Sequence, residues 1–212
     1  MKPQIYLTSS VGEVASSLSR KLPKLPKEYE LLFITTAADV EEGDKQWLED
    51  DKNALLEAGF PLRDYTIAGK TPQQIRSDFE SVTGLYFSGG DTFYLLHQLQ
   101  KTGSKQIVED LVHQGMLYIG TSAGSIVAGP DIRPVRMVES KEWVSSVKDT
   151  RGVGLVDVVV LPHWGSSLFK DRYFDSKMKP SYSTDYKIIL LNDFQYLQVL
   201  EHGYEIIDVR YE

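Results

Sequence analysis

Short apolar runs alternate with amphipathic stretches along most of this 212-residue chain. The apolar runs are rich in β-branched and aromatic side chains, which is typical of strands, and the amphipathic stretches repeat with the period of a helix. The pattern predicts strands at residues 5–8, 31–35, 62–67, 85–88, 117–120, 156–161, 187–191, 196–200 and 204–209. It predicts helices at residues 11–22, 45–58, 72–80, 93–101, 104–114 and 123–128.

This order of elements predicts an α/β fold of the doubly wound type. Strands that alternate with helices favour a mostly parallel sheet with helices on both faces. The last three predicted strands follow one another through short polar turns, Asn192-Asp193 and Glu201-His-Gly203, so we expect them to form an antiparallel C-terminal extension. The sequence contains no internal repeat and no linker, and we expect residues 1–212 to form a single domain.

Composition and charge exclude several classes of function. The formal net charge is −7 and the pI is about 5.2, which argues against a nucleic-acid-binding surface. No apolar run approaches the length of about 18 residues that a membrane span needs, and the N-terminus lacks the apolar core of a secretion signal. We therefore expect a cytoplasmic protein without membrane contact.

The residues that bind metals are sparse. The chain has no cysteine, which excludes disulfides, thiolate metal sites and a cysteine nucleophile. No two of the four histidines stand at the spacing of ligands on one helix face. We expect neither a metal nor an organic cofactor.

The segment Gly120-Thr-Ser122-Ala-Gly124 has the pattern of a nucleophile elbow. It follows an apolar run and precedes small, helix-compatible residues, so Ser122 would stand at the apex of a sharp turn between strand and helix. The free N–H groups of that helix would stabilise negative charge on a substrate oxygen. A plain tight turn that contains a serine is the structural alternative.

A serine nucleophile needs a base, and His163 is the best placed histidine. It follows the β-branched run Val156-Asp-Val-Val-Val-Leu-Pro, and the carboxyl end of a buried strand is where α/β proteins bind ligands. His97 and His113 lie in helical stretches and His202 lies in a polar turn, where a structural or surface role is the simpler interpretation.

The acid that would orient the imidazole is less obvious. Asp131 follows the elbow helix too closely, and Asp157 lies within the strand that leads to the histidine. Glu139 and Glu142 remain, and spacing alone does not choose between them. The acids considered between Ser122 and His163 are Asp131, Glu139, Glu142, Asp149 and Asp157.

At this point the chain resembles peptidase family S51, the serine peptidases of the dipeptidase E and cyanophycinase type with a class I glutamine amidotransferase-like fold. Four blocks carry the resemblance: Gln4-Ile-Tyr-Leu-Thr-Ser, Leu85-Tyr-Phe-Ser-Gly-Gly90-Asp91-Thr92, Gly120-Thr-Ser122-Ala-Gly124 and Leu161-Pro-His163. The second and third blocks in this order are fairly specific together, whereas either alone is weak.

The resemblance implies roles for particular residues. Ser122 would be the nucleophile and His163 the base, and the backbone N–H groups of Gly90 and Ala123 would form the oxyanion hole. The simpler interpretation of the second block is a strand-to-helix turn capped by Asp91 or Thr92, and both readings can hold together.

The third residue of the triad departs from the dipeptidase pattern. Counting from the nucleophile as in the aspartyl dipeptidases lands on Met137, which cannot orient an imidazole. Glu139 matches the spacing of the glutamate in the cyanophycinase branch, so the resemblance assigns Glu139 as the acid, with Glu142 in reserve.

The resemblance also implies residues that would bind substrate. Asp91 stands where much of the family has asparagine; beside Thr92, it would favour a free amino group over a carboxylate. Arg172 would bind an acidic side chain, because a guanidinium can donate two parallel hydrogen bonds to a carboxylate.

The function expected from the sequence is a serine-type exopeptidase or dipeptidase. It would hydrolyse short peptides at an acidic residue, Asp above all, through a Ser-His-Glu triad and an acyl-enzyme. Alternatives are a cyanophycinase-like β-aspartyl peptidase and a binding or regulatory homologue with weak turnover. The expected partner is a small peptide substrate, and the protein would be a monomer or a homodimer.

Overall fold

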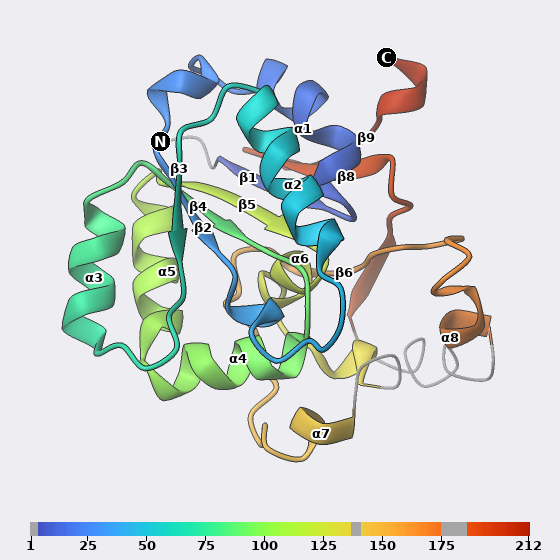
Figure 1. Ribbon diagram of the computed structural model, residues 1–212. Helices are drawn as coiled ribbons and strands as arrows, with labels where there is room; N and C mark the ends of the chain where they lie inside the picture. The colour runs from blue at the N-terminus through green and yellow to red at the C-terminus, as the bar shows by residue number, and fades with distance from the viewer. Residues whose placement is uncertain (1–3, 137–140, 175–185) are drawn as a thin grey trace.

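The computed structural model describes residues 4–136, 141–174 and 186–212. Within these ranges seven strands form one sheet in the order β3-β2-β4-β5-β1-β8-β9 (Figure 1). These strands are β1 (Ile5–Thr8), β2 (Leu31–Ile34), β3 (Leu62–Tyr65), β4 (Gly84–Phe87), β5 (Leu117–Thr121), β8 (Gln195–Leu200) and β9 (Gly203–Asp208). A second sheet pairs β6 (Val158–Leu161) with β7 (Lys187–Leu190).

The strand directions confirm the expected fold class. Strands β1 to β5 are mutually parallel, β8 runs antiparallel to β1, and β9 runs antiparallel to β8. Strands β1, β2, β4 and β5 are buried along their whole length. That burial explains their nearly continuous apolar sequences, because helices cover a parallel sheet on both faces.

Helices cover the sheet on both faces. The described helices are α1 (Val11–Arg20), α2 (Gln46–Glu57), α3 (Pro72–Glu80), α4 (Thr92–Lys101), α5 (Ser104–His113), α6 (Ala123–Val127), α7 (Lys141–Val144) and α8 (Lys170–Phe174). Those from α1 to α6 pack on the sheet. Short 3-10 helices lie at Pro26–Glu28, Thr36–Ala38, Arg133–Val135 and Val209–Tyr211. The described helices are all too short or too polar to span a membrane.

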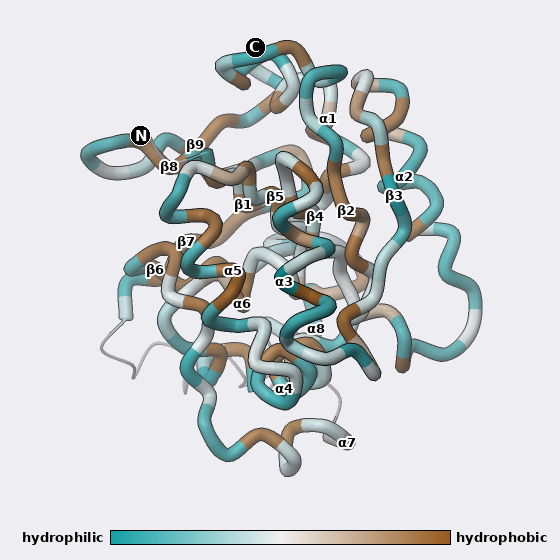
Figure 2. Tube along the Cα trace, turned by 90° about the vertical axis from the view of Figure 1, so that its left-hand side faces the viewer, coloured by the Kyte–Doolittle hydropathy of each residue, from teal (hydrophilic) through white to brown (hydrophobic). Residues whose placement is uncertain are grey.

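Two buried clusters separate the helices into layers. The apolar faces of α1 and α2 pack with one side of the sheet. Helices α3, α4, α5 and α6 pack with the other side, which also receives β6. Figure 2 shows hydrophobic stretches concentrated along the strands and hydrophilic ones on the outer turns. The core is therefore built as the alternation of apolar and amphipathic segments predicts.

One detail of the expected antiparallel extension is wrong: the strand predicted at residues 187–191 forms, but it lies in the second sheet. Strand β7 does not join the antiparallel extension; it pairs in parallel with β6 in the separate sheet, from Val158 opposite Lys187 to Leu161 opposite Leu190. A parallel pair needs a long crossover, and the connection between β6 and β7, which includes α8, supplies it. As a result, β6 and β7 end at the same edge.

The buried carboxylate of Asp51 joins α1, α2 and β4. Asp51 of α2 is only 5% exposed. Its Oδ1 accepts the N–H of Gly12 at the start of α1 over 3.1 Å, and its Oδ2 accepts the hydroxyl of Tyr86 on β4 over 2.8 Å. Burial raises the pKa of Asp51 to about 6, although both hydrogen bonds oppose the shift.

Replacing Asp51 by asparagine is expected to increase stability more at neutral pH than at acid pH. The folded protein binds the Asp51 proton more tightly than the unfolded chain, whose carboxyl has a pKa near 3.8, so the wild type loses stability as the pH rises from about 4 through about 6. Two pKa units correspond to roughly 3 kcal/mol. Urea unfolding of both proteins at pH 4, 6 and 8 measures this difference.

Asn53→Ala is the matched control, because Asn53 is an exposed, uncharged residue on the same helix. The difference in unfolding free energy between this control and the wild type should stay nearly constant with pH. If the difference in unfolding free energy between Asp51→Asn and the wild type is also constant from pH 4 to pH 8, the raised pKa of Asp51 is contradicted.

Candidate active site

Ser122 occupies a sharp turn between β5 and α6. Its φ is +49°, a backbone conformation that non-glycine residues rarely adopt. A Cβ on Gly120 would lie 2.6 Å from the carbonyl oxygen of Gly124, and one on Gly124 would lie 2.2 Å from that of Phe87. Only glycine fits at these two positions, so the structure contains the elbow that the sequence pattern predicts.

His163 lies beside Ser122. The histidine Nε2 is 3.0 Å from the serine Oγ, within hydrogen-bond distance. His163 follows β6 with a φ of +60°, and its ring stacks on Phe169 with centroids 4.4 Å apart. The predicted nucleophile and the predicted base therefore come together across 41 residues of sequence.

Asp193 contacts the other ring nitrogen of His163. Its Oδ1 is 2.6 Å from the histidine Nδ1. Because an ionised carboxylate only accepts hydrogen bonds, this contact puts the proton on Nδ1. The lone pair on Nε2 is then free to accept the proton of Ser122. The side chains of His163 and Asp193 are 17% and 31% exposed, so the pair is accessible from solvent.

The strand topology explains why Asp193 lies here. It stands in the turn between β7 and β8; β7 ends at the same edge as β6, which leads to His163. Strand β8 begins opposite the end of β1, with Tyr196 paired to Thr8. An antiparallel strand has to begin where its parallel neighbours end, so this turn is held at the edge that carries Ser122.

The sequence reasoning missed Asp193 because it considered only acids between Ser122 and His163. A signal was available in the polar turn Asn192-Asp193, directly after an apolar run. Glu139 lies outside the described residues, as does Met137, and Glu142 falls in α7 with its side chain outside the described part. The assignment of Glu139 stays a prediction, and Asp193 enters as its rival.

Opposing effects act on the Asp193 carboxyl. Burial alone would raise its pKa, but the hydrogen bond and charge of His163, with the hydroxyl of Ser9, together hold the pKa below its ordinary value. Asp193 is thus ionised at neutral pH, which is the form that can orient and stabilise an imidazolium.

The loop after β4 lies against the nucleophile. A Cβ on Gly89 would be 3.4 Å from the Ser122 Cβ and 3.9 Å from its Oγ. Gly90 has a φ of +125°, and a Cβ there would lie 2.2 Å from the carbonyl oxygen of Ala37. The hydrogen bonds of the described residues use neither the N–H of Gly90 nor that of Ala123. Both donors are available for an oxyanion.

The predicted substrate-binding residues have different surroundings. Asp91 is 2% exposed and accepts the N–H of Tyr94, so its carboxylate caps α4. Thr92 is completely buried. Arg172 falls in α8, but its side chain lies outside the described part of the chain. Their roles toward substrate stay predictions.

Two further residues stand near the oxyanion loop. The indole of Trp47, which is 37% exposed, reaches within 3.5 Å of the Gly89 Cβ position and so flanks Ser122. Lys45 lies two residues earlier, and its Nζ donates to the carbonyl of Ala38 over 2.7 Å. Gly90 packs against the preceding carbonyl, that of Ala37. The sequence analysis singled out neither, because proximity to the site comes only from the fold.

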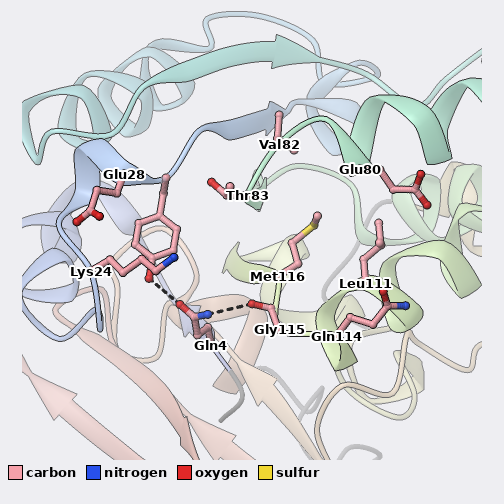
Figure 3. Close-up of a pocket in the computed structure, with 11 residues that line it drawn as sticks. Gln4, Lys24, Glu28, Glu80, Val82, Thr83, Leu111, Gln114, Gly115 and Met116 are labelled. Carbon is pink, nitrogen blue, oxygen red and sulfur yellow. Dashed lines mark hydrogen bonds between the residues drawn. The ribbon is translucent and has the colours of Figure 1, made fainter. Parts of the chain in front are cut away.

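A separate depression of about 320 Å³ lies at the opposite edge of the sheet (Figure 3). Gln4, Thr83 and Met116, which line it, directly precede β1, β4 and β5, whereas Ser122 follows β5. It is therefore remote from the serine. Among the residues that the structure describes, no group of three or more His, Cys, Asp or Glu could hold a metal ion.

An α/β fold with Ser122, His163 and Asp193 joined in series has the arrangement of a serine hydrolase. Comparison with known families gives a narrower class: the model for peptidase family S51 matches residues 7–207, and the chain belongs to that family. Its enzyme class is accordingly that of the peptidases.

Proteins similar to this chain are also described as peptidases. An uncharacterized peptidase of Pasteurella multocida (strain Pm70) is 30% identical over 169 residues, which cover 80% of each chain. Peptidase E of Shewanella oneidensis is 43% identical over 58 residues, 27% of this chain and 25% of the relative. The crystal structure of a Listeria monocytogenes EGD-e protein described as a candidate peptidase E has 25% identity and a TM-score of 0.87, and covers 98% of this chain and 99% of that one.

Proposed function

We propose that the protein is a serine-type peptidase that hydrolyses short peptides through an acyl-enzyme on Ser122. The observation that carries the proposal is the hydrogen-bond distance of 3.0 Å between Ser122 Oγ on its strained turn and His163 Nε2. The 2.6 Å contact of Asp193 with Nδ1 supports Asp193 as the orienting acid, in place of the glutamate that the resemblance implies.

The reaction follows from these contacts. His163 Nε2 takes the proton of Ser122 as Oγ attacks the scissile carbonyl carbon, and the N–H groups of Gly90 and Ala123 bind the oxyanion. The imidazolium, stabilised by Asp193, then gives its proton to the leaving amine as the C–N bond breaks. Water attacks the acyl-enzyme with His163 again as the base, which releases the acid and restores Ser122.

The preferred substrate in this proposal is a short peptide with an acidic residue, Asp above all, at the cleaved bond. Lys45 supports this preference, because its ammonium is bound to the carbonyl of Ala38, the residue after the one whose carbonyl Gly90 packs against, and this bond uses one of its three donors. Arg172 is the second cation that we propose for a substrate carboxylate. The relatives named peptidase E are consistent with a peptide substrate.

Two alternatives stay open. A cyanophycinase-like enzyme would cleave β-aspartyl bonds at the same serine. A binding or regulatory homologue would keep the fold with weak turnover.

The test is a peptide panel with a covalent probe. The wild type is expected to release free amino acid from Asp-Xaa dipeptides at least about tenfold faster than from Ala-Xaa, since one charged contact contributes roughly 1.5 kcal/mol or more. Glu-Xaa dipeptides and β-aspartyl-arginine complete the panel, and a fluorophosphonate is expected to label the protein.

Lys45→Met and Arg172→Met separate the two cations, because a residue that binds the carboxylate should raise KM for Asp-Xaa and leave Ala-Xaa unchanged. Turnover of β-aspartyl-arginine alone would favour the cyanophycinase-like alternative. A folded wild type that neither labels nor cleaves any peptide would overturn the proposal in favour of a binding role.

A further inference from the structure

Ser9 is a buried serine that the reaction above does not use. It directly follows β1, the strand between β5 and β8, and is completely inaccessible to solvent. It ends the block Gln4-Ile-Tyr-Leu-Thr-Ser, but the sequence assigned it no role. Its hydroxyl nevertheless lies between the base and the acid of the triad.

The hydroxyl contacts both partners. The backbone N–H of His163 donates to Ser9 Oγ over 2.6 Å, and Ser9 Oγ donates to Asp193 Oδ1 over 2.8 Å. It is also 3.5 Å from His163 Nδ1. Ser9 and the imidazole therefore share one carboxylate oxygen, and a single side chain fixes the distance between the histidine backbone and the aspartate.

The backbone of His163 needs this support. A φ of +60° is a strained conformation for a non-glycine residue and persists only where surrounding contacts hold it. The next residue, Trp164, donates to Leu191 over 2.9 Å, which ties the same turn to the end of β7. Ser9 adds the corresponding tie to β1, the strand that pairs with β5 just before the elbow.

We propose that Ser9 is the positioning residue of the triad, which locks His163 and Asp193 in the geometry that activates Ser122. This inference rests on the proposed function for its catalytic consequence. Loss of the hydroxyl would leave a buried N–H without its acceptor and Asp193 without one of its donors. The hydroxyl also helps to keep the Asp193 carboxyl ionised, since it contributes to the lowered pKa of that group.

The experiment compares Ser9→Ala with Ser9→Thr, which keeps the hydroxyl, and with Ser17→Ala. Ser17 is a matched control: it is a buried serine on α1 that donates to Glu212, away from the triad. The rate of fluorophosphonate labelling should fall about 10- to 100-fold in Ser9→Ala, as misplaced catalytic groups do. It should recover in Ser9→Thr and stay within twofold of the wild type in Ser17→Ala.

The second readout needs no substrate. Proton NMR should show a far-downfield resonance from the hydrogen bond between His163 Nδ1 and Asp193, identified by its loss in His163→Gln. It should shift or broaden in Ser9→Ala and be unchanged in Ser17→Ala. A Ser9→Ala protein with an unaltered resonance would overturn the proposal, whatever its labelling rate. A wild type that shows the resonance but does not label would instead count against the proposed function.

Discussion

Ser122→Ala is expected to abolish covalent labelling and to reduce peptide hydrolysis by on the order of a millionfold, because no other group can form the acyl-enzyme. The substitution removes one oxygen from a partly exposed side chain, so the fold should survive. Labelling followed by mass spectrometry, and release of free amino acid from the best peptide of the panel, measure the two effects.

Ser125 is the control within the same elbow. Its hydroxyl is buried and lies within hydrogen-bond distance of the carbonyls of Thr8 and Gly120, which share its one proton. The adduct should map to Ser122, and Ser125→Ala should retain labelling. Hydrolysis by Ser122→Ala at the wild-type rate, from a preparation free of contaminating peptidase, would refute the nucleophile assignment.

Local patterns predicted most of the fold because each element satisfies its own physical requirements. The helix predicted at residues 72–80 is α3, which begins at Thr71 with reciprocal hydrogen bonds to Gln74 and a proline in its first turn. The elbow was equally visible, since the close approach of the chain around Gly120 and Gly124 leaves no alternative to glycine. Such signals lie within a few residues of sequence.

The pairing of β7 was harder to predict. Two apolar runs joined by a short polar turn look like a hairpin, and residues 187–191 and 196–200 have that pattern. The hydrogen-bond partner of a strand is chosen by long-range packing, and β7 pairs with β6 rather than with β8. No local sequence feature indicates which strand β7 pairs with.

This pairing also determined what could be foreseen of the candidate site. Ser122 and His163 carry signatures of their own, one in a glycine pattern and one at the end of a strand. Asp193 carries none beyond its polar turn, and its approach to His163 depends on β7 and β8 both meeting the same edge. The acid was therefore sought only between Ser122 and His163, an interval that does not contain Asp193.

Asp193→Asn is expected to lower kcat about 10⁴-fold with little change in KM. The asparagine side chain has nearly the same shape, so the packing should persist. Its amide would donate to Nδ1 and so favour the imidazole tautomer with the proton on Nε2, which cannot accept the proton of Ser122. Steady-state kinetics on the best peptide, with thermal unfolding as a check of the fold, measures the effect.

Glu139→Gln decides between the two assignments of the acid. If Asp193 orients His163, this variant should retain activity within a few-fold, because the Nδ1 position is already occupied at 2.6 Å. A 10⁴-fold loss in Glu139→Gln with near-normal activity in Asp193→Asn would restore the glutamate implied by the resemblance. Large losses in both would mean that two carboxylates are needed, one on Nδ1 and one acting on the substrate, and the sole assignment of Asp193 would fail.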